Sequence, residues 1–233
     1  MIVFSIEKLV SAIQTILPFI PITILVTVCT TVFGSVLGGL LAILRFSSKT
    51  AYRSMAKMII GLLRCTPPIV LLFLVYYGIP QLMLSVFHQD INYWSKGIFV
   101  VIAFTLLFAA NSAELFRASY QAIPKGQREA GLSAGLSESQ TFRRILFPQL
   151  IGHALPNFLT QILSLLKDGA LAYTIGLLDI MGAGQNFISR NFGNYALETY
   201  LAITFFYWFA ALILEGMSRR IEVYVSKGKQ PAR

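Results

Sequence analysis

An otherwise apolar chain is interrupted by one polar stretch rich in small residues, Ile123-Pro124-Lys125-Gly126-Gln127-Arg128-Glu129-Ala130-Gly131-Leu132-Ser133-Ala134-Gly135-Leu136-Ser137, which runs on to Pro148. A helix needs no insert of this kind to cross a lipid bilayer, because apolar residues alone are stable against the hydrocarbon. We therefore expect this stretch to lie, and to act, on the water side of the membrane.

The composition places the chain among membrane proteins. Of its 233 residues, 56% are hydrophobic and 12% are charged, and the mean hydropathy is +0.69. These values lie outside the range of ordinary soluble domains, so we expect an all-α protein that crosses the membrane several times. One crossing needs about 20 mostly apolar residues. Five stretches have this length and character: Pro18–Leu44, Met58–Leu84, Gly97–Phe116, Ile151–Leu178 and Tyr195–Met217.

Basic residues near the ends of these spans predict the orientation. They cluster after the first, third and fifth spans, whereas the opposite side holds Lys8, Lys96 and Arg190. Because cytoplasmic loops carry the excess of Lys and Arg, we expect the N-terminus outside, and the polar insert and the C-terminus inside. The chain then divides into an N-terminal helix (1–17), a transmembrane domain (18–217, with the inner loop 123–148) and a basic cytoplasmic tail (218–233).

The N-terminal 17 residues show a helical period. Apolar residues from Ile6 to Leu17 fall on one face, and Glu7 and Lys8 fall on the other. This pattern predicts an amphipathic helix in the outer membrane interface. A simple extension of the first span fits the same pattern.

The sequence carries no pattern for catalysis, metal binding or nucleotide binding. The histidines His88 and His153 and the cysteines Cys29 and Cys65 have no metal-ligand spacing. No Gly-x-x-x-x-Gly-Lys-Ser/Thr loop is present, so we expect no ATP hydrolysis and no cofactor in this chain alone. The net charge of +9 is spread over the loops of one side, and topology explains it without a nucleic-acid partner.

Local rules predict a helix–turn–helix within the inner loop. A helix over Lys125–Ala134 would present small residues, and Gly131 costs about 1 kcal/mol of helix propensity relative to Ala, which close contact with another body would repay. Gly135 suits a left-handed helix stop. Ser137 to Gln140 matches a capping box at the start of a second helix, and Pro148 would limit that helix.

These residues carry a family resemblance. Glu129-Ala130-Gly131, three residues, Gly135, nine residues and Ile145-Leu146-Phe147-Pro148 resembles the signature loop of ABC importer permeases. That loop usually reads Glu-Ala-Ala, three residues, Gly, nine residues, Ile-x-Leu-Pro. Here Gly131 replaces the second Ala and Phe147 replaces the Leu, and both changes keep the small or apolar character.

Further motifs are similar to the polar amino-acid branch of these permeases. They are Arg64-Cys65-Thr66-Pro67-Pro68, Ala113-Glu114-Leu115-Phe116-Arg117, Ile123-Pro124-Lys125-Gly126-Gln127 and Leu166-Lys167-Asp168-Gly169-Ala170-Leu171. The branch usually reads Lys-Asp-Thr-Ser-Leu where this chain has Lys-Asp-Gly-Ala-Leu. The stretch from Ala172 to Gly182 looks most like permeases for cystine and related sulfur compounds.

The resemblance implies a type I ABC importer fold in a bacterial cytoplasmic membrane, and an ATP-driven importer of a polar amino acid, with cystine or a related sulfur compound as the candidate. It implies two ATP-binding cassette subunits that bind ATP and Mg, a second copy of this chain or a homologous permease, and an extracytoplasmic solute-binding protein. The residues implied to couple to the ATPase are Gln127, Glu129, Ala130, Gly131, Ala134 and Gly135. The alternative is an ion-gradient-driven transporter with Lys167, Asp168 and Glu114 as its relay, which leaves the inner loop without a role.

Polar residues inside the spans are candidates for the substrate path: Thr66, Lys167, Asp168 and Gly169. The fourth span would break near Gly169 and expose backbone groups to the passage. For Lys167 and Asp168, the alternative is a neutralised ion pair packed between helices. For Thr66, the alternative is a local hydrogen bond to a backbone carbonyl that Pro67 and Pro68 leave without a donor. The pair Gly34 and Gly38 suits close helix packing, within the chain or across a dimer.

Overall fold

The computed structural model describes residues 4–227, with side chains for residues 4–220. Residues 1–3 of the expected N-terminal helix and 228–233 of the expected tail lie outside the described residues. The described part is helical and holds no strand. Its α-helices are α1 (Ile6–Ile16), α2 (Ile20–Arg45), α3 (Thr50–Cys65), α4 (Pro68–Phe87), α5 (Lys96–Gln121), α6 (Lys125–Ser133), α7 (Glu138–Thr141), α8 (Phe147–Gly169), α9 (Ile180–Arg190) and α10 (Ala196–Lys227).

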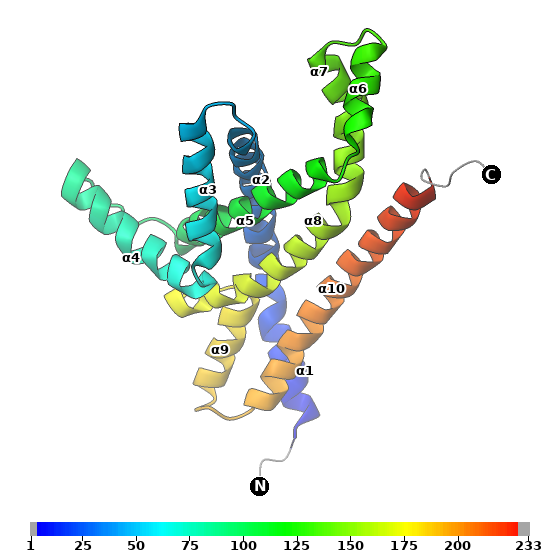
Figure 1. Cartoon of the computed structure of the whole chain (residues 1–233). Coiled ribbons are helices and arrows are strands. Elements are labelled where there is room, and N and C mark those ends of the chain that lie inside the picture. The colour runs from blue at the N-terminus through cyan, green and yellow to red at the C-terminus, as the bar shows by residue number, and fades with distance from the viewer. Residues whose placement is uncertain (1–3, 228–233) are drawn as a thin grey trace.

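Within the described part, four helical stretches are long and apolar enough to cross a membrane. They are Ile6–Arg45, Pro68–Phe87, Lys96–Gln121 and Ala196–Arg220. The chain is therefore a multi-pass membrane protein, as its composition predicts. In Figure 1 α6 and α7 lie at one end of the molecule, whereas α1 and the connection from α9 to α10 lie at the opposite end.

The second expected span, Met58–Leu84, is not one continuous helix. α3 ends at Cys65, Thr66 is extended (ψ 125°), and α4 begins at Pro68. A proline disfavours the helical conformation in the residue before it, so the tandem prolines Pro67 and Pro68 separate two helices where hydropathy alone indicates one. The structure thus has two helices where the sequence predicts one span.

The fourth expected span, Ile151–Leu178, corresponds to α8 and the 3₁₀ helix Ala170–Ile175 that follows it. The α-helix ends at Gly169, near the predicted break, but the chain stays helical and continues directly as the 3₁₀ helix. Gly176 then adopts a left-handed conformation (φ 79°) and accepts a hydrogen bond from Lys96 Nζ at 3.3 Å. α8 is not among the four apolar stretches, because Asn, Gln, His and Pro residues lower its hydropathy.

The N-terminal helix α1 begins at a side-chain cap from Ser5 and runs through a 3₁₀ turn (Leu17–Phe19) into α2. Its buried residues Ala12 and Ile16 pack in a cluster with residues of α9 and α10. Protein therefore covers one apolar face of α1. The placement of this helix in the membrane interface remains a prediction.

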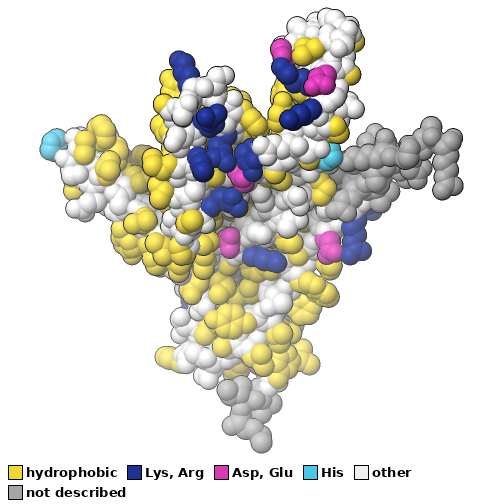
Figure 2. All heavy atoms as spheres, viewed as in Figure 1, with side chains coloured by type: hydrophobic (Ala, Val, Ile, Leu, Met, Phe, Trp, Pro, Cys, Tyr) yellow, Lys and Arg dark blue, Asp and Glu magenta, His cyan; other side chains and the backbone are white. Residues whose placement is uncertain are grey.

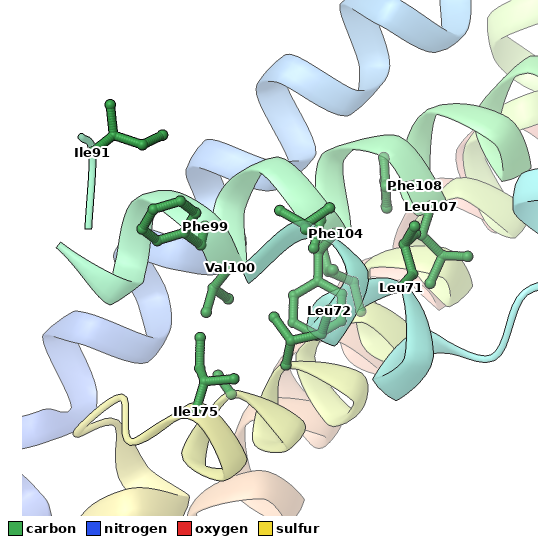
Figure 3. Packing of buried hydrophobic residues seen from close by; sticks show 13 residues of the cluster. Leu71, Leu72, Ile91, Phe99, Val100, Phe104, Leu107, Phe108 and Ile175 are labelled. Atoms are coloured by element: carbon green, nitrogen blue, oxygen red, sulfur yellow. The ribbon is translucent and has the colours of Figure 1, made fainter. Parts of the chain in front are cut away.

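Helix α5 is the centre of the fold and packs against α2, α3, α4 and α8. Phe99, Phe104 and Phe108 of α5 are at most 3% exposed, and they form one cluster with residues of α4 and of the 3₁₀ helix. Figure 3 shows Phe104 lying close to Leu72 of α4, and Val100 facing Ile175.

The glycine pair of α2 acts within the chain. A Cβ atom on Gly34 would lie 2.8 Å from Phe108 Cδ1, and a Cβ atom on Gly38 would lie 2.8 Å from the carbonyl oxygen of Ala109. Both glycines therefore let α2 approach α5 closely, as small residues do in membrane helix packing. Gly39, one residue on, meets nothing within 4 Å.

We expect Gly38→Ala to destabilise the protein, because the new methyl group meets backbone that cannot move aside easily. Overpacking of this kind costs about 1–3 kcal/mol, against a helix-propensity gain of about 1 kcal/mol. Gly39→Ala receives the same propensity gain with no clash, so it is the control. Thermal unfolding in detergent should show a lower midpoint for Gly38→Ala than for Gly39→Ala, and equal midpoints would contradict this packing.

Candidate functional site

The polar insert forms two short helices, α6 and α7, joined by a tight turn. Gly135 has a left-handed backbone (φ 81°), as predicted for a helix stop. The N–H of Leu136 donates to the carbonyl of Gly131 at 3.2 Å, and the N–H of Gly135 donates to that of Leu132 at 3.0 Å. These two bonds are the Schellman pattern, which satisfies the last carbonyls of α6.

The predicted capping box starts α7. The backbone N–H of Gln140 donates to the Ser137 hydroxyl at 3.2 Å, and the backbone N–H of Ser137 donates to the Gln140 side-chain oxygen at 2.9 Å. Two backbone donors at the start of the helix are thereby satisfied. The helix–turn–helix predicted from the sequence is confirmed in this local geometry.

Gly131 has a role that the sequence does not reveal. It is buried, and a Cβ atom there would lie 2.6 Å from Thr141 Cγ2 and 3.0 Å from Ile145 Cδ1. The missing side chain thus allows α6 to pack on α7 and the segment after it. The close contact that compensates for this glycine is inside the chain, rather than with another body.

Polar side chains tie α6 to the following segments. Arg128 forms an ion pair with Glu138, with its Nε donating to Glu138 Oε2 at 3.1 Å. Gln149 of α8 donates through Nε2 to Gln127 Oε1 at 3.2 Å. With the Gly131–Thr141 contact, these bonds make α6, α7 and the start of α8 one compact unit, which we call the inner module (residues 125–149).

The expected helix end at Pro148 is wrong. A π-helical turn, Phe142–Leu146, follows α7 directly and leads into α8, so that Pro148 lies in the first turn of α8. A proline fits there because the first turn of a helix leaves its N–H groups without intrahelical partners. The inner module is therefore continuous with α8 instead of being separated from it.

Most of the residues expected to couple to an ATPase are accessible on the inner module. Gly131 is buried, whereas the other five are exposed: Gln127, Glu129, Ala130, Ala134 and Gly135. Arg128 pairs with Glu138. Among the described residues, the Glu129 carboxylate makes no ion pair. Figure 2 shows acidic and basic side chains together on the lobe that α6 and α7 form.

A groove with a volume of about 1410 Å³ lies between the inner module and the end of α2. Phe46 and Ile43 line it on the α2 side, and Phe147 and Ile151 line it on the α8 side. The charged residues that line the groove are Lys125, Arg128 and Glu129. Figure 2 shows a hollow between the lobe that α6 and α7 form and the neighbouring lobe of α2 and α3.

Glu114 near the end of α5 is held by two arginines. Arg117 donates to it through Nε at 3.0 Å, and Arg45 of α2 lies 3.6 Å from its other oxygen. The pairing with Arg117 is the one that helical spacing predicts. The contact of Glu114 with Arg45 joins the C-terminal parts of α2 and α5.

The candidate path residues lie on two separate elements. Thr66, at the α3–α4 break, donates its hydroxyl proton to the Leu62 carbonyl at 2.8 Å, which is the local bond expected for a freed carbonyl. Lys167 is exposed and Asp168 is half-buried at the end of α8. Among the described residues no ion pair joins Lys167 to Asp168, so the structure does not hold the neutralised pair.

Two buried carboxylates were missed by sequence reasoning. Asp179 caps α9 by accepting from the N–H of Gly182 at 2.8 Å, and Glu198 is fully buried and accepts from the N–H of Ser5 at 2.9 Å. Both stabilise the packing of α1, α9 and α10. An acidic residue in the first turn of the fifth span is the signal that could have identified Glu198.

Three comparisons place this geometry among known proteins. The family model "Binding-protein-dependent transport system inner membrane component" matches residues 34–226. The L-cystine transport system permease protein TcyL of Bacillus subtilis (strain 168) is 35% identical over 226 residues, which are 97% of this chain and 93% of that protein. The arginine ABC transporter permease protein ArtQ of Haemophilus influenzae is 42% identical over 150 residues, covering 63% and 67% of the two chains.

A solved structure described as an amino acid ABC transporter with histidines has the same fold. It superposes with a TM-score of 0.83 at 25% sequence identity, and the match covers 95% of this chain and 99% of that one.

We expect Gly131→Ala to loosen the inner module, because its methyl group would meet Thr141. Gly126→Ala is the control, since a Cβ atom there meets nothing within 4 Å. The double variant Gly131→Ala with Thr141→Ala should recover, because Thr141 Oγ1 makes no hydrogen bond that would be lost. Limited trypsin digestion measures the loosening as faster cleavage within 125–149, and equal rates for both single variants would contradict it.

Proposed function

Because this chain belongs to the family of binding-protein-dependent transport system inner membrane components, we propose that it is the permease subunit of an ATP-driven importer that moves a polar amino acid into a bacterial cell. Its fold is that of a type I ABC importer permease, and its relatives are amino-acid permeases.

The inner module is the observation that carries the coupling proposal. It protrudes at one end of the molecule, it exposes small residues and the Glu129 carboxylate, and it is continuous with α8. A helix in this position can transmit movement of an attached subunit to the membrane bundle as a rigid body. We assign Gln127, Glu129, Ala130, Ala134 and Gly135 to the contact with an ATP-binding cassette subunit, and Gly131 to the internal packing that supports this contact.

The assembly that this role requires has several parts. Two ATP-binding cassette subunits bind ATP and Mg and hydrolyse ATP, since this chain carries no phosphate-binding loop. A second copy of this chain, or a homologous permease, completes a two-fold arrangement. An extracytoplasmic solute-binding protein delivers the substrate to the side opposite the inner module. The complex lies in the bacterial cytoplasmic membrane, with the N-terminus outside.

The substrate we propose is a polar amino acid, with cystine as the first candidate. The names of two relatives specify cystine and arginine, and both are polar amino acids. Thr66, Lys167, Asp168 and Gly169 are the candidate path residues. An ion-gradient relay through Glu114 is disfavoured, because Arg117 and Arg45 already hold this carboxylate.

The function is tested with the complex purified from its native membrane. An ATP-binding cassette protein should co-purify with this chain, and L-cystine with the binding protein should stimulate ATP hydrolysis in vesicles. Uptake that is driven by a membrane potential with no ATPase present would refute the proposal.

We expect Glu129→Lys to reduce the amount of ATPase that co-purifies at least about tenfold, a loss of about 1.4 kcal/mol of binding free energy, because it replaces an exposed anion at the proposed contact. Glu7→Lys makes the same charge change on α1, at the opposite end of the molecule, and should leave the ATPase bound. Thermal unfolding should show both variants folded. Normal ATPase recovery with Glu129→Lys would exclude the assigned contact.

We expect Asp168→Asn to raise the substrate KM for uptake with the ATPase still bound, because a carboxylate that attracts the substrate ammonium group is lost. Gly169→Ala should lower the uptake rate through added helix stiffness, since a Cβ atom there meets nothing within 4 Å and causes no clash. Uptake kinetics in vesicles measure both effects. Unchanged KM and rate in both variants would remove these residues from the path.

A further inference from the structure

The groove between the inner module and the end of α2 has apolar walls. On the α2 side, every residue that lines it from Gly39 to Phe46 is apolar or a glycine. On the α8 side, the lining residues recur every three or four positions and form one apolar helix face. They are Phe147, Leu150, Ile151, Ala154, Leu155 and Phe158. Phe46 and Phe147 are 47% and 46% exposed, so the chain itself leaves both walls uncovered.

Aromatic contacts hold the walls of the groove in place. Phe46 packs edge-to-face on Tyr120 of α5, with the ring centroids 5.0 Å apart. Phe116 of α5 stacks on Phe158 of α8, with the ring centroids 6.3 Å apart. All four rings line the groove. Since aromatic pairs of this kind add stability beyond the area that they bury, the groove is a preformed feature of the fold.

One end of the groove is polar. Ser47 and Ser48 line it just after the end of α2, and Lys125 lines it at the start of α6. Lys125 is exposed and forms no ion pair with any residue that the structure describes. Two hydroxyl groups and an ammonium group therefore meet at the same mouth, and each can donate a hydrogen bond to an anionic oxygen.

The charge around this mouth is mainly positive. Glu129 also lines the groove, and so does Arg128, which pairs with Glu138. The residues next in the chain to lining residues add three exposed cations: Lys49, Arg143 and Arg144. Figure 2 shows Lys and Arg side chains on both lobes beside the hollow. The mouth therefore attracts an anion, and the walls accept an apolar chain.

The dimensions of the groove indicate which molecule has this combination. From Phe147 to Phe158, α8 advances about 16 Å at 1.5 Å per residue. One leaflet of a bilayer contributes about 15 Å of hydrocarbon, half of the about 30 Å core. The volume of about 1410 Å³ exceeds the roughly 300–1,000 Å³ of pockets for small molecules. A phospholipid has acyl chains of this length and an anionic phosphate at their polar end.

We propose that the groove binds one anionic phospholipid of the inner leaflet. An acyl chain lies between α2 and the apolar face of α8, and the phosphate lies at the mouth, bound by Lys125, Ser47 and Ser48. Basic pockets between membrane helices on the cytoplasmic side bind anionic head groups in this way. The bound lipid joins the end of α2 to the inner module. This inference rests on the orientation given under the proposed function, and on neither the substrate nor the ATPase contact.

Photocrosslinking in the native membrane identifies the occupant. The photoreactive residue p-benzoylphenylalanine replaces Phe147, which lines the groove and is exposed. After illumination of the assembled complex, we expect the mass of this chain to rise by that of one phospholipid. A product with a second permease copy, or with an ATP-binding cassette subunit, would show that protein covers the groove and would overturn the proposal.

Lipid binding to the purified complex tests the role of the charge. Dioleoylphosphatidylglycerol and dioleoylphosphatidylcholine carry the same acyl chains, but the first has a net negative charge. We expect the anionic lipid to bind at least about tenfold more tightly, and Lys125→Gln to reduce this preference at least about threefold. Lys57→Gln, on α3, removes an exposed lysine outside the groove and is the control. Equal affinity for the two lipids, or equal effects of the two variants, would refute the site.

A side chain placed in the groove tests the position of the acyl chain. Gly39 lines the groove and a Cβ atom there meets nothing within 4 Å, so Gly39→Phe inserts a ring into the space that the lipid occupies. Gly61→Phe on α3 is the control, because a Cβ atom there also meets nothing within 4 Å and Gly61 lies outside the groove. We expect Gly39→Phe to weaken binding of the anionic lipid at least about tenfold and Gly61→Phe to leave it unchanged. Equal binding by both would contradict the assignment.

Thermal unfolding shows whether each variant is folded, and Lys125→Gln decides the question if Gly39→Phe is not. Both lipid measurements are read without transport. A complex that binds the anionic lipid in the groove but does not couple ATP hydrolysis to uptake would therefore refute the proposed function and leave the lipid site standing.

Discussion

The close approach of α2 to α5 at Gly34 and Gly38 is the contact on which the rest of the structure depends. It sets α5 in the centre, where its phenylalanines fill the space between α4 and the 3₁₀ helix. From that position α5 fixes α8 through the hydrogen bonds of Gln161. Because α8 carries the inner module at one end and Lys167 and Asp168 at the other, the placement of both depends on this pair of glycines.

Helix α8 unites the two parts of the proposed mechanism. At its start, the ion pair of Arg128 with Glu138 and the packing of Gly131 on Thr141 hold the inner module together. At its end, Gly169 leads into a 3₁₀ helix that contacts α4 and α9. A movement applied at α6, which packs on α7 and the segment after it, can therefore reach Lys167 along α8. The π-helical turn Phe142–Leu146 lies between them, and such turns often occur at functional sites.

Local chemistry was readable from the sequence, whereas contacts between distant residues were not. The left-handed stop at Gly135, the capping box at Ser137 and the pairing of Glu114 with Arg117 depend on residues within five positions of each other. The contact of Gly131 with Thr141 depends on how the turn folds α6 back. Pro148 was misread because a proline can either end a helix or begin one, and the π-helical turn before it decides which.

Hydropathy weighs every side of a helix equally, but lipid touches the uncovered side alone. In α2 the uncovered side is apolar, so the span is obvious in the sequence. In α8, from Gly152 to Gly169, the exposed residues are all polar and the apolar residues are buried or partly buried, which lowers the mean without making the helix unfit for a membrane assembly. A membrane helix with this arrangement gains stability where water, a polar partner or a substrate meets its open side. The weak hydropathy of α8 is thus a consequence of the polar residues on its open side, Asn157, Thr160, Ser164 and Lys167.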